Sequence, residues 1–235
     1  MLEKVDLTKK ISKEEYKAKM PQMEIELGRL QRECRELKIP VMIVFEGFGA
    51  SGKGVQIGKL IQSMDPRGFQ VFPIKAETED ERMHPFLWRF WTKTPEAGRI
   101  AIFDGSWYRK VLIDRFEKRT REKEIETAFH SIEAFEKQLT DGGTILVKLL
   151  LDIDQKEQKK RFEKLLEKKE TAWRVSQGDR ERNAKYSEYA AMMEEVLYRS
   201  DTKSAPWTVI EATDRRFATV KIYMTVIHAL AEAVE

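Results

Sequence analysis

Residues 47–53 read Gly-Phe-Gly-Ala-Ser-Gly-Lys, which matches the G-x-x-x-x-G-K pattern of a phosphate-binding loop. Glycines let the backbone turn its N–H groups toward phosphate oxygens, and the lysine adds a mobile positive charge. The apolar run 41–45 predicts a buried strand before the loop, and residues 53–64 read as a helix after it. We therefore predict Lys53 as a catalytic residue and phosphate binding by the whole loop, namely Gly47, Gly49, Ala50, Ser51, Gly52, Lys53 and Gly54.

The residue after the lysine is Gly54, where many nucleotidases carry a serine or threonine that holds magnesium. A metal ion therefore needs another ligand. Asp104 ends the predicted strand 100–104, and the carboxyl ends of parallel strands meet beside such a loop. We predict Asp104 as a catalytic and metal-binding residue for Mg²⁺, with Mn²⁺ as the alternative, a role compatible with capping the next helix.

Predicted strands and helices alternate along the chain. The strands cover residues 41–45, 69–74, 100–104, 144–151 and 207–210, and the helices cover 53–64, 79–91, 109–118, 123–139 and 214–234. This alternation predicts an α/β protein with a parallel sheet, in a three-layer α/β/α P-loop kinase fold. We expect a single domain over residues 1–235, divided into a leading helix (1–38), a core (39–152), a helical lid (153–200), and the final strand and helix of the core (201–235).

Composition excludes several classes of protein. The single cysteine, Cys34, cannot form an intrachain disulfide and is predicted on a helix surface, and the three histidines lack metal-ligand spacing. No membrane span or export signal is predicted, so we expect a cytoplasmic protein without a membrane partner. The net charge of +3 is too small to predict nucleic-acid binding.

Positive charge is nevertheless concentrated in one stretch. Residues 155–185 carry eleven Lys or Arg against six Asp or Glu. By itself such a run is typical of a solvated helical pair, but it also suits the binding of a polyanion.

Several separated blocks together resemble the polyphosphate kinase 2 family. They occur in the family's order from about residue 41 to the end of the chain, and they are V-F-E-G with G-K-G (44–47 and 52–54), D-P-R-G-F (65–69), P-F-L-W-R-F-W (85–91), I-F-D with S-W-Y (102–104 and 106–108) and A-P-W (205–207). The tryptophan-rich blocks make the resemblance specific.

The resemblance implies transfer of phosphoryl groups between inorganic polyphosphate and nucleoside mono- or diphosphates, AMP or ADP above all, with magnesium. It implies that Arg161 in the lid is catalytic and that Arg67, Lys75 and Arg174 bind phosphate or line the site. Glu81, Arg89, Gln158, Trp173 and Asp179 also fall at matching positions. The acceptor nucleotide stays open.

The chain departs from the family pattern at two positions. Gly49 stands where the family has an aspartate in G-x-D-A-A-G-K-G, and Gly105 stands where it has an arginine in F-D-R-S-W-Y. Losing one such group commonly costs about 10² to 10³ in rate. We therefore keep a catalytically weakened polyphosphate-binding domain as an alternative. Arg109, Lys110 and Arg115 are the nearby cations that would replace the missing arginine.

A second alternative is an ATP-dependent nucleoside monophosphate kinase, because residues 51–56 resemble the adenylate-kinase loop. The proline and threonine of that loop are missing here, and the tryptophan blocks have no place in it. Self-association as a homo-oligomer is also expected, from the leading helix and from the predicted exposure of Trp88, Trp91 and Trp107.

Overall fold

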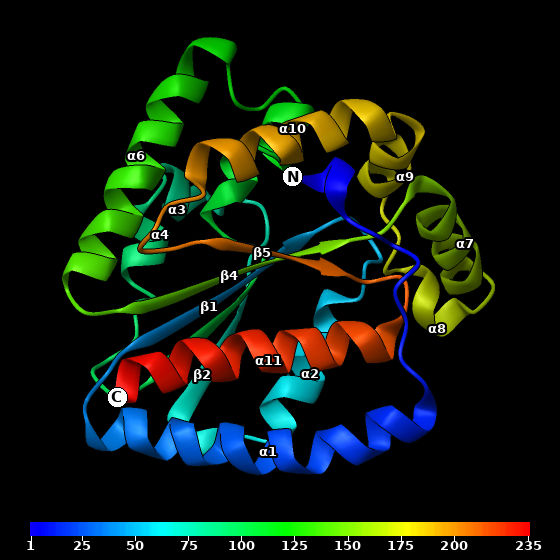
Figure 1. The fold of residues 1–235 in the computed structure, drawn as a ribbon. Coiled ribbons are helices and arrows are strands. Elements are labelled where there is room, and N and C mark those ends of the chain that lie inside the picture. Colours follow the sequence, from blue (N-terminus) through cyan, green and yellow to red (C-terminus); the bar gives the residue numbers. More distant parts are fainter.

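The computed structural model describes residues 1–235 and contains one five-stranded parallel sheet (Figure 1). The strand order is β2-β3-β1-β4-β5. The bounds are β1 (Val41–Gly47), β2 (Phe69–Pro73), β3 (Ile100–Asp104), β4 (Ile145–Asp152) and β5 (Trp207–Glu211). Every residue of the central strand β1 is buried, as its continuous apolar sequence predicts. The predicted α/β class with a parallel sheet is confirmed.

Helices cover both faces of the sheet (Figure 1). On one face lie α2 (Lys53–Gln62) and α11 (Arg215–Val234), and α1 (Lys13–Glu36) packs on the outer side of α11. On the other face lie α6 (Glu122–Asp141) and α10 (Tyr186–Ser200). Pro21 lies inside α1 and does not begin it. The result is the expected three-layer arrangement, with α1 added outside one layer.

Several predicted helices are interrupted in the structure. Residues 79–91 form two single turns, α3 (Glu79–Arg82) and α4 (Trp88–Trp91), because Pro85 favours extended backbone before it. Residues 107–118 form the 3-10 turn η3 (Trp107–Lys110) and α5 (Ile113–Phe116). Two further 3-10 turns are η1 (Leu2–Lys4) and η2 (Pro66–Gly68).

The predicted lid lies beyond the carboxyl ends of the strands (Figure 1). It contains α7 (Gln155–Leu166), α8 (Lys169–Ala172) and α9 (Gln177–Ala184), followed by α10. Within the predicted lid, α9 and α10 are separated at Lys185, the C-cap of α9. Ser176 begins α9 through a capping box with Asp179.

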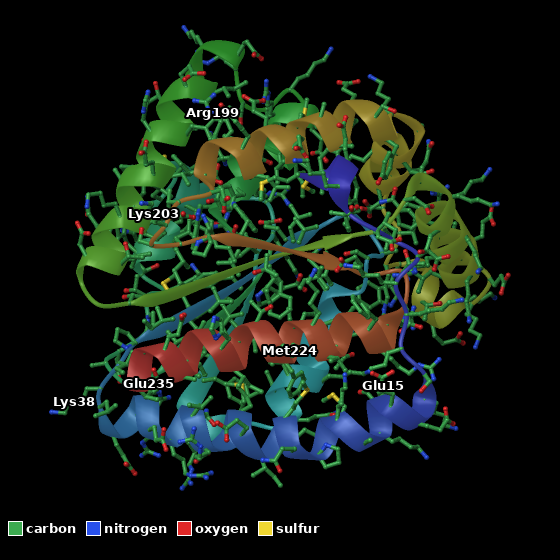
Figure 2. All side chains as sticks on the ribbon, viewed as in Figure 1. Glu15, Lys38, Arg199, Lys203, Met224 and Glu235 are labelled. Carbon is green, nitrogen blue, oxygen red and sulfur yellow. The ribbon has the colours of Figure 1, made fainter.

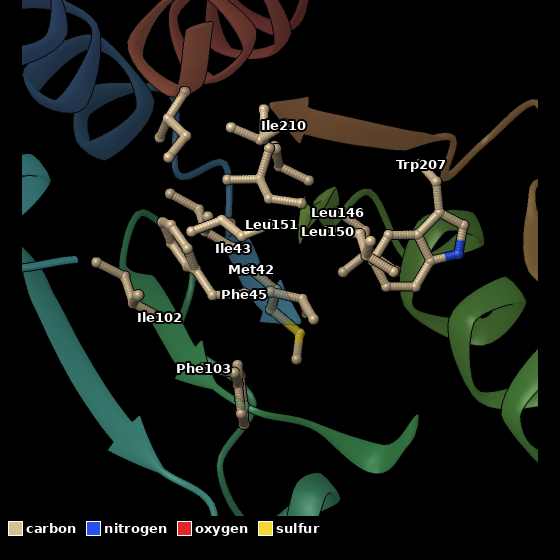
Figure 3. Packing of buried hydrophobic residues seen from close by; sticks show 14 of the residues in the cluster. Met42, Ile43, Phe45, Ile102, Phe103, Leu146, Leu150, Leu151, Trp207 and Ile210 are labelled. Atoms are coloured by element: carbon tan, nitrogen blue, oxygen red, sulfur yellow. The ribbon is translucent and has the colours of Figure 1, made fainter. Parts of the chain in front are cut away.

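The hydrophobic core lies between the sheet and its helices (Figure 3), and two predictions about exposure were wrong. Cys34 is buried, because it lies on the side of α1 that also buries Leu27 and Leu30, and burial raises the pKa of its thiol to about 11. Trp107 is fully buried and packs edge-on against Phe135 and Phe90, so it is unavailable for self-association. Trp91 is 41% exposed.

A buried polar network crosses this core. Lys148, in the middle of β4, is fully buried and donates to Glu136 of α6 at 2.7 Å and to the carbonyl of Ser200 at 2.6 Å. Trp107 and Tyr108 both donate to the same Glu136 carboxylate. Burial lowers the pKa of Lys148, although Glu136 opposes this shift. The S-W-Y block thus ties the segment after β3 to α6 and β4.

Helix α11 is long and apolar enough, by length and composition alone, to cross a membrane. In the structure it packs on β4 and β5 with one side and on α1 with another. Met224 lies on its outer surface and is 55% exposed (Figure 2). This is the environment of a core helix.

Candidate functional site

The loop between β1 and α2 has the backbone of an anion-binding site. Gly47 and Gly52 have φ angles of +139° and +107°, and a Cβ at Gly47 would lie 2.3 Å from the carbonyl oxygen of Leu151. Five backbone N–H groups in this loop and at the start of α2 donate no hydrogen bond within the protein. They belong to Gly49, Ala50, Gly52, Lys53 and Gly54. Together with the positive end of the α2 dipole, these donors suit phosphate oxygens.

Lys53 folds back over this loop. Its ammonium group donates to the carbonyl of Gly47 at 3.0 Å and lies 3.5 Å from that of Phe48. A phosphate oxygen can replace these carbonyls as the acceptor. The Lys53 ammonium charge therefore lies where it would meet a phosphate bound at the loop. The structure thus brings all seven predicted loop residues together.

Asp104 lies at the carboxyl end of β3, next to β1. Its Oδ2 is 4.0 Å from the point where a Cβ on Gly54 would be, and its carboxylate accepts no hydrogen bond from the protein side chains. No group of three His, Cys, Asp or Glu residues surrounds the loop as a full metal cage. A single open carboxylate beside a phosphate loop fits Mg²⁺, which keeps waters and takes its remaining ligands from substrate phosphates.

Glu46, the residue before the loop, is a member of the site that the sequence reasoning missed. It is buried and accepts a 2.7 Å hydrogen bond from Ser106. Burial raises the pKa of its carboxyl, while the charge of Lys53 lowers it and that of Asp104 raises it further. The signal was a charged residue at the end of an otherwise apolar strand.

The lid contacts the loop through two residues of α7. Gln158 donates to the carbonyl of Gly49 at 3.0 Å. Arg161 donates to four carbonyls at 2.8–3.1 Å, those of Ala50, Ser51, Ala212 and Thr213. Its Nε donates to Glu157. Because all of its nitrogens are engaged, Arg161 fixes the loop against the end of β5 in this structure. Its predicted catalytic role stays a prediction.

The other predicted cations differ in their positions. Arg67 precedes β2, at the amino edge of the sheet, whereas the loop follows the carboxyl end of β1. It pairs with Asp65 at 2.8 Å and its side chain is 82% exposed. The structure therefore separates Arg67 from the phosphate loop, because α2 carries the chain back across the sheet before β2 begins.

Four of the remaining cations lie beyond the carboxyl edge or in the lid. Lys75 follows β2 and is exposed. The Nε of Arg109 is 3.3 Å from Asp114, and the ammonium group of Lys110 lies 5.8 Å from the Phe86 ring centre. Arg174 is exposed and stacks on Trp173 at the lid surface.

Arg115, on α5, is tied up by partners. It pairs with Glu195 of α10 and lies 3.5 Å from Glu122. These carboxylates neutralise the Arg115 charge on the side of the sheet that α10 covers. The Arg115 side chain is therefore not directed at the phosphate loop.

Asp152 at the carboxyl end of β4 gives a pH-dependent prediction. Burial, with Asp154 and Glu211 nearby, raises its pKa from 3.8 to about 6. The folded state therefore binds this proton more tightly than the unfolded state, and stability is lost as the pH rises from about 4 through 6. We expect Asp152→Asn to raise the free energy of unfolding at pH 8 by about 1–3 kcal/mol and to change it little at pH 4. Urea unfolding at both pH values checks this; an equal change at both would contradict it.

Comparison with known proteins agrees with this geometry. Residues 10–235 match the model of the family described as polyphosphate kinase 2. A polyphosphate:AMP phosphotransferase of Pseudomonas syringae pv. tomato is 36% identical over 99% of this chain, and one from Pseudomonas aeruginosa is 35% identical over 99%. The chain spans about half the length of these relatives, 47% of each.

A solved structure gives the same result. The crystal structure of polyphosphate kinase 2 from Arthrobacter aurescens TC1 superposes with a TM-score of 0.92 at 30% identity, covering 99% of this chain and 85% of that one. The match of the family model to nearly the entire chain, together with these identities, leaves no ambiguity of assignment: the chain belongs to the polyphosphate kinase 2 family.

Proposed function

We propose that this chain transfers phosphoryl groups between inorganic polyphosphate and a nucleoside mono- or diphosphate, using Mg²⁺. The observation that carries the proposal is the loop 47–54, in which five N–H groups without a protein partner converge with Lys53 and Asp104. The names of the relatives, which include polyphosphate:AMP and NDP-polyphosphate phosphotransferases, support the choice of substrates.

The chain's own residues account for most of the proposed chemistry. The N–H groups of the loop and the Lys53 ammonium hold the phosphates and neutralise the charge that builds up on the group in transit. Asp104 would hold Mg²⁺, which supplies further neutralisation when bound. Gln158 and Arg161 keep the loop carbonyls turned away from the phosphates by binding them from the lid. Phe48 stacks on Tyr186 at 4.8 Å and links loop and lid.

A panel of donors and acceptors tests this proposal. AMP and ADP are each offered with polyphosphate or with ATP, in the presence of Mg²⁺, and the nucleotide products are separated by chromatography. We expect ADP from AMP, or ATP from ADP, with polyphosphate as the donor. Turnover with ATP alone would instead identify a nucleoside monophosphate kinase.

The second candidate is a polyphosphate-binding domain with weakened catalysis, and the structure favours it at two positions. A Cβ on Gly49 would lie 2.9 Å from Oδ1 of the lid residue Asp179, and Gly105 has a φ of +75°. Both positions are thus shaped for glycine, by a close contact at the first and by backbone conformation at the second. Binding of inorganic tripolyphosphate without turnover in the same panel would select this candidate.

A further inference from the structure

Helix α9 of the lid places an ion pair directly over the phosphate loop. The Oδ1 atom of Asp179 lies 2.9 Å from the point where a Cβ on Gly49 would be. A side chain at Gly49 would meet this carboxylate, so in this lid position the glycine leaves the space that Asp179 occupies. Figure 1 shows α9 and α7 beyond the strand ends that carry the loop.

Asp179 cannot easily leave this position. Its Oδ2 accepts hydrogen bonds from the backbone N–H and the hydroxyl of Ser176, at 3.0 and 2.6 Å, in the capping box that begins α9. Burial raises the pKa of this carboxyl, but the hydrogen bonds from Ser176 and Arg182 outweigh burial and lower it. Asp179 is therefore a fixed negative charge at the entrance of the loop.

Arg182 holds the opposite charge at the same place. Its Nη2 donates to Oδ1 of Asp179 at 2.7 Å and its Nη1 donates to Glu117 at 2.8 Å. The side chain is only 10% exposed. Glu117 is the C-cap of α5 in the core, so the guanidinium bridges the closed lid and the core above Gly49.

The same enclosure contains the groups around Lys53. Burial raises the pKa of the Tyr189 hydroxyl, and the charges of Arg182, Glu46 and Asp179 all act on it. The guanidinium carbon of Arg182 lies 5.8 Å from the centre of the Tyr189 ring, and this ring packs edge-on against Phe48 of the loop at 6.0 Å. Glu46 in turn lies beside Lys53, Asp104 and Ser106.

The loop has more acidic than basic side chains around it, so a bound phosphate would need a further cation to balance its negative charge. Glu46, Asp104 and Asp179 are acidic, whereas Lys53 is the cation of the loop itself. Arg161 is occupied by carbonyls and Arg174 stacks at the lid surface. A guanidinium suits phosphate oxygens because it offers two parallel donors. Arg182 is the lid arginine that lies beside Gly49, through its contact with Asp179, and its side chain is only 10% exposed.

We propose that Arg182 is a phosphate-contacting residue of the closed lid, whose guanidinium turns from Asp179 to an oxygen of the phosphoryl group bound at the loop. The inference rests on the proposed function and adds a residue to it. Asp179 then acts as the positioning residue that keeps the guanidinium over the loop before phosphate arrives, whereas Glu117 only ties Arg182 to the end of α5.

The test uses the full chain and three variants. Arg182→Gln removes the guanidinium, Arg180→Gln removes an exposed charge of the same helix, and Glu117→Gln weakens the bridge while keeping Arg182. For each, kcat and KM for polyphosphate-dependent transfer are measured, together with the affinity for inorganic tripolyphosphate by calorimetry. Circular dichroism melting checks that each variant folds.

We expect Arg182→Gln to lower kcat by about 10² to 10³-fold and tripolyphosphate affinity by about tenfold or more. Arg180→Gln is expected within about threefold of the parent, the size of a screened surface charge effect. Glu117→Gln is also expected within about threefold, because the glutamine amide oxygen still accepts a hydrogen bond from Arg182. An equal loss in Glu117→Gln would show that Arg182 is only a clasp between lid and core. An equal loss in Arg180→Gln would show a general charge effect, and either result overturns the proposal.

The affinity measurement separates this inference from the proposed function. If the parent shows no turnover with any donor, the proposed function fails, and the tripolyphosphate affinities of the variants still decide the role of Arg182. A tenfold loss confined to Arg182→Gln supports phosphate contact. Unchanged affinity in that variant overturns it.

Discussion

Replacing Lys53 by alanine is expected to lower polyphosphate-dependent phosphoryl transfer by about 10³-fold or more, with little change in the melting temperature. The ammonium group is the cation of the loop itself, where it lies beside the carbonyls of Gly47 and Phe48. Its protein contacts are two hydrogen bonds to carbonyls of its own loop, so its removal leaves the core intact. Single-turnover rates and tripolyphosphate affinity check the first part, and thermal unfolding checks the second.

Lys17→Ala is the matched control for that experiment. Lys17 is an exposed lysine of α1, far along the chain from the loop, and it forms no ion pair. We expect this variant to keep the parent rate. A Lys53→Ala protein that turns over within tenfold of the parent would remove the loop from the proposed chemistry.

Replacing Glu136 by alanine is expected to lower the free energy of unfolding by about 3–5 kcal/mol. The change leaves Lys148 as a fully buried charge without its counterion and leaves the donors of Trp107 and Tyr108 without their acceptor. An unmatched buried charge costs more than the ion pair contributed, because the desolvation of the lysine is no longer offset. Urea unfolding followed by tryptophan fluorescence measures the loss.

Glu133→Ala serves as the control for this loss. Glu133 lies on α6 one turn before Glu136 but is exposed and unpaired, so its replacement should stay within about 0.5 kcal/mol of the parent. A loss below about 1 kcal/mol for Glu136→Ala would mean that water reaches Lys148 after the change. The network would then contribute little to stability.

The two predictions concern residues on opposite faces of the sheet. Lys53 begins α2 after the central strand, and Glu136 lies across the sheet on α6. Because the first acts on phosphate and the second on the core, their effects should be separable: Lys53→Ala changes rate without stability, and Glu136→Ala changes stability first.

Local sequence determined the parts of this protein that depend on neighbouring residues along the chain. The buried strand 41–47 follows from an uninterrupted apolar run, and the loop follows from glycines at positions where φ is positive or a Cβ has no room. Asp104 was found because parallel strands must end at the same edge of a sheet. The family resemblance was likewise carried by short blocks in a fixed order.

Only the tertiary structure decided which distant side chains meet. Arg67 falls within a matching block but lies at the opposite edge of the sheet, because α2 reverses the chain before β2. Trp107 and Cys34 lie between polar residues in the sequence, yet both are buried. The segment of Trp107 packs against α6, and the helix of Cys34 packs against α11. Asp179 and Arg182 come to lie over Gly49 through packing of the lid on the loop. Their charges interact through space, and spacing along the chain carries no record of that distance.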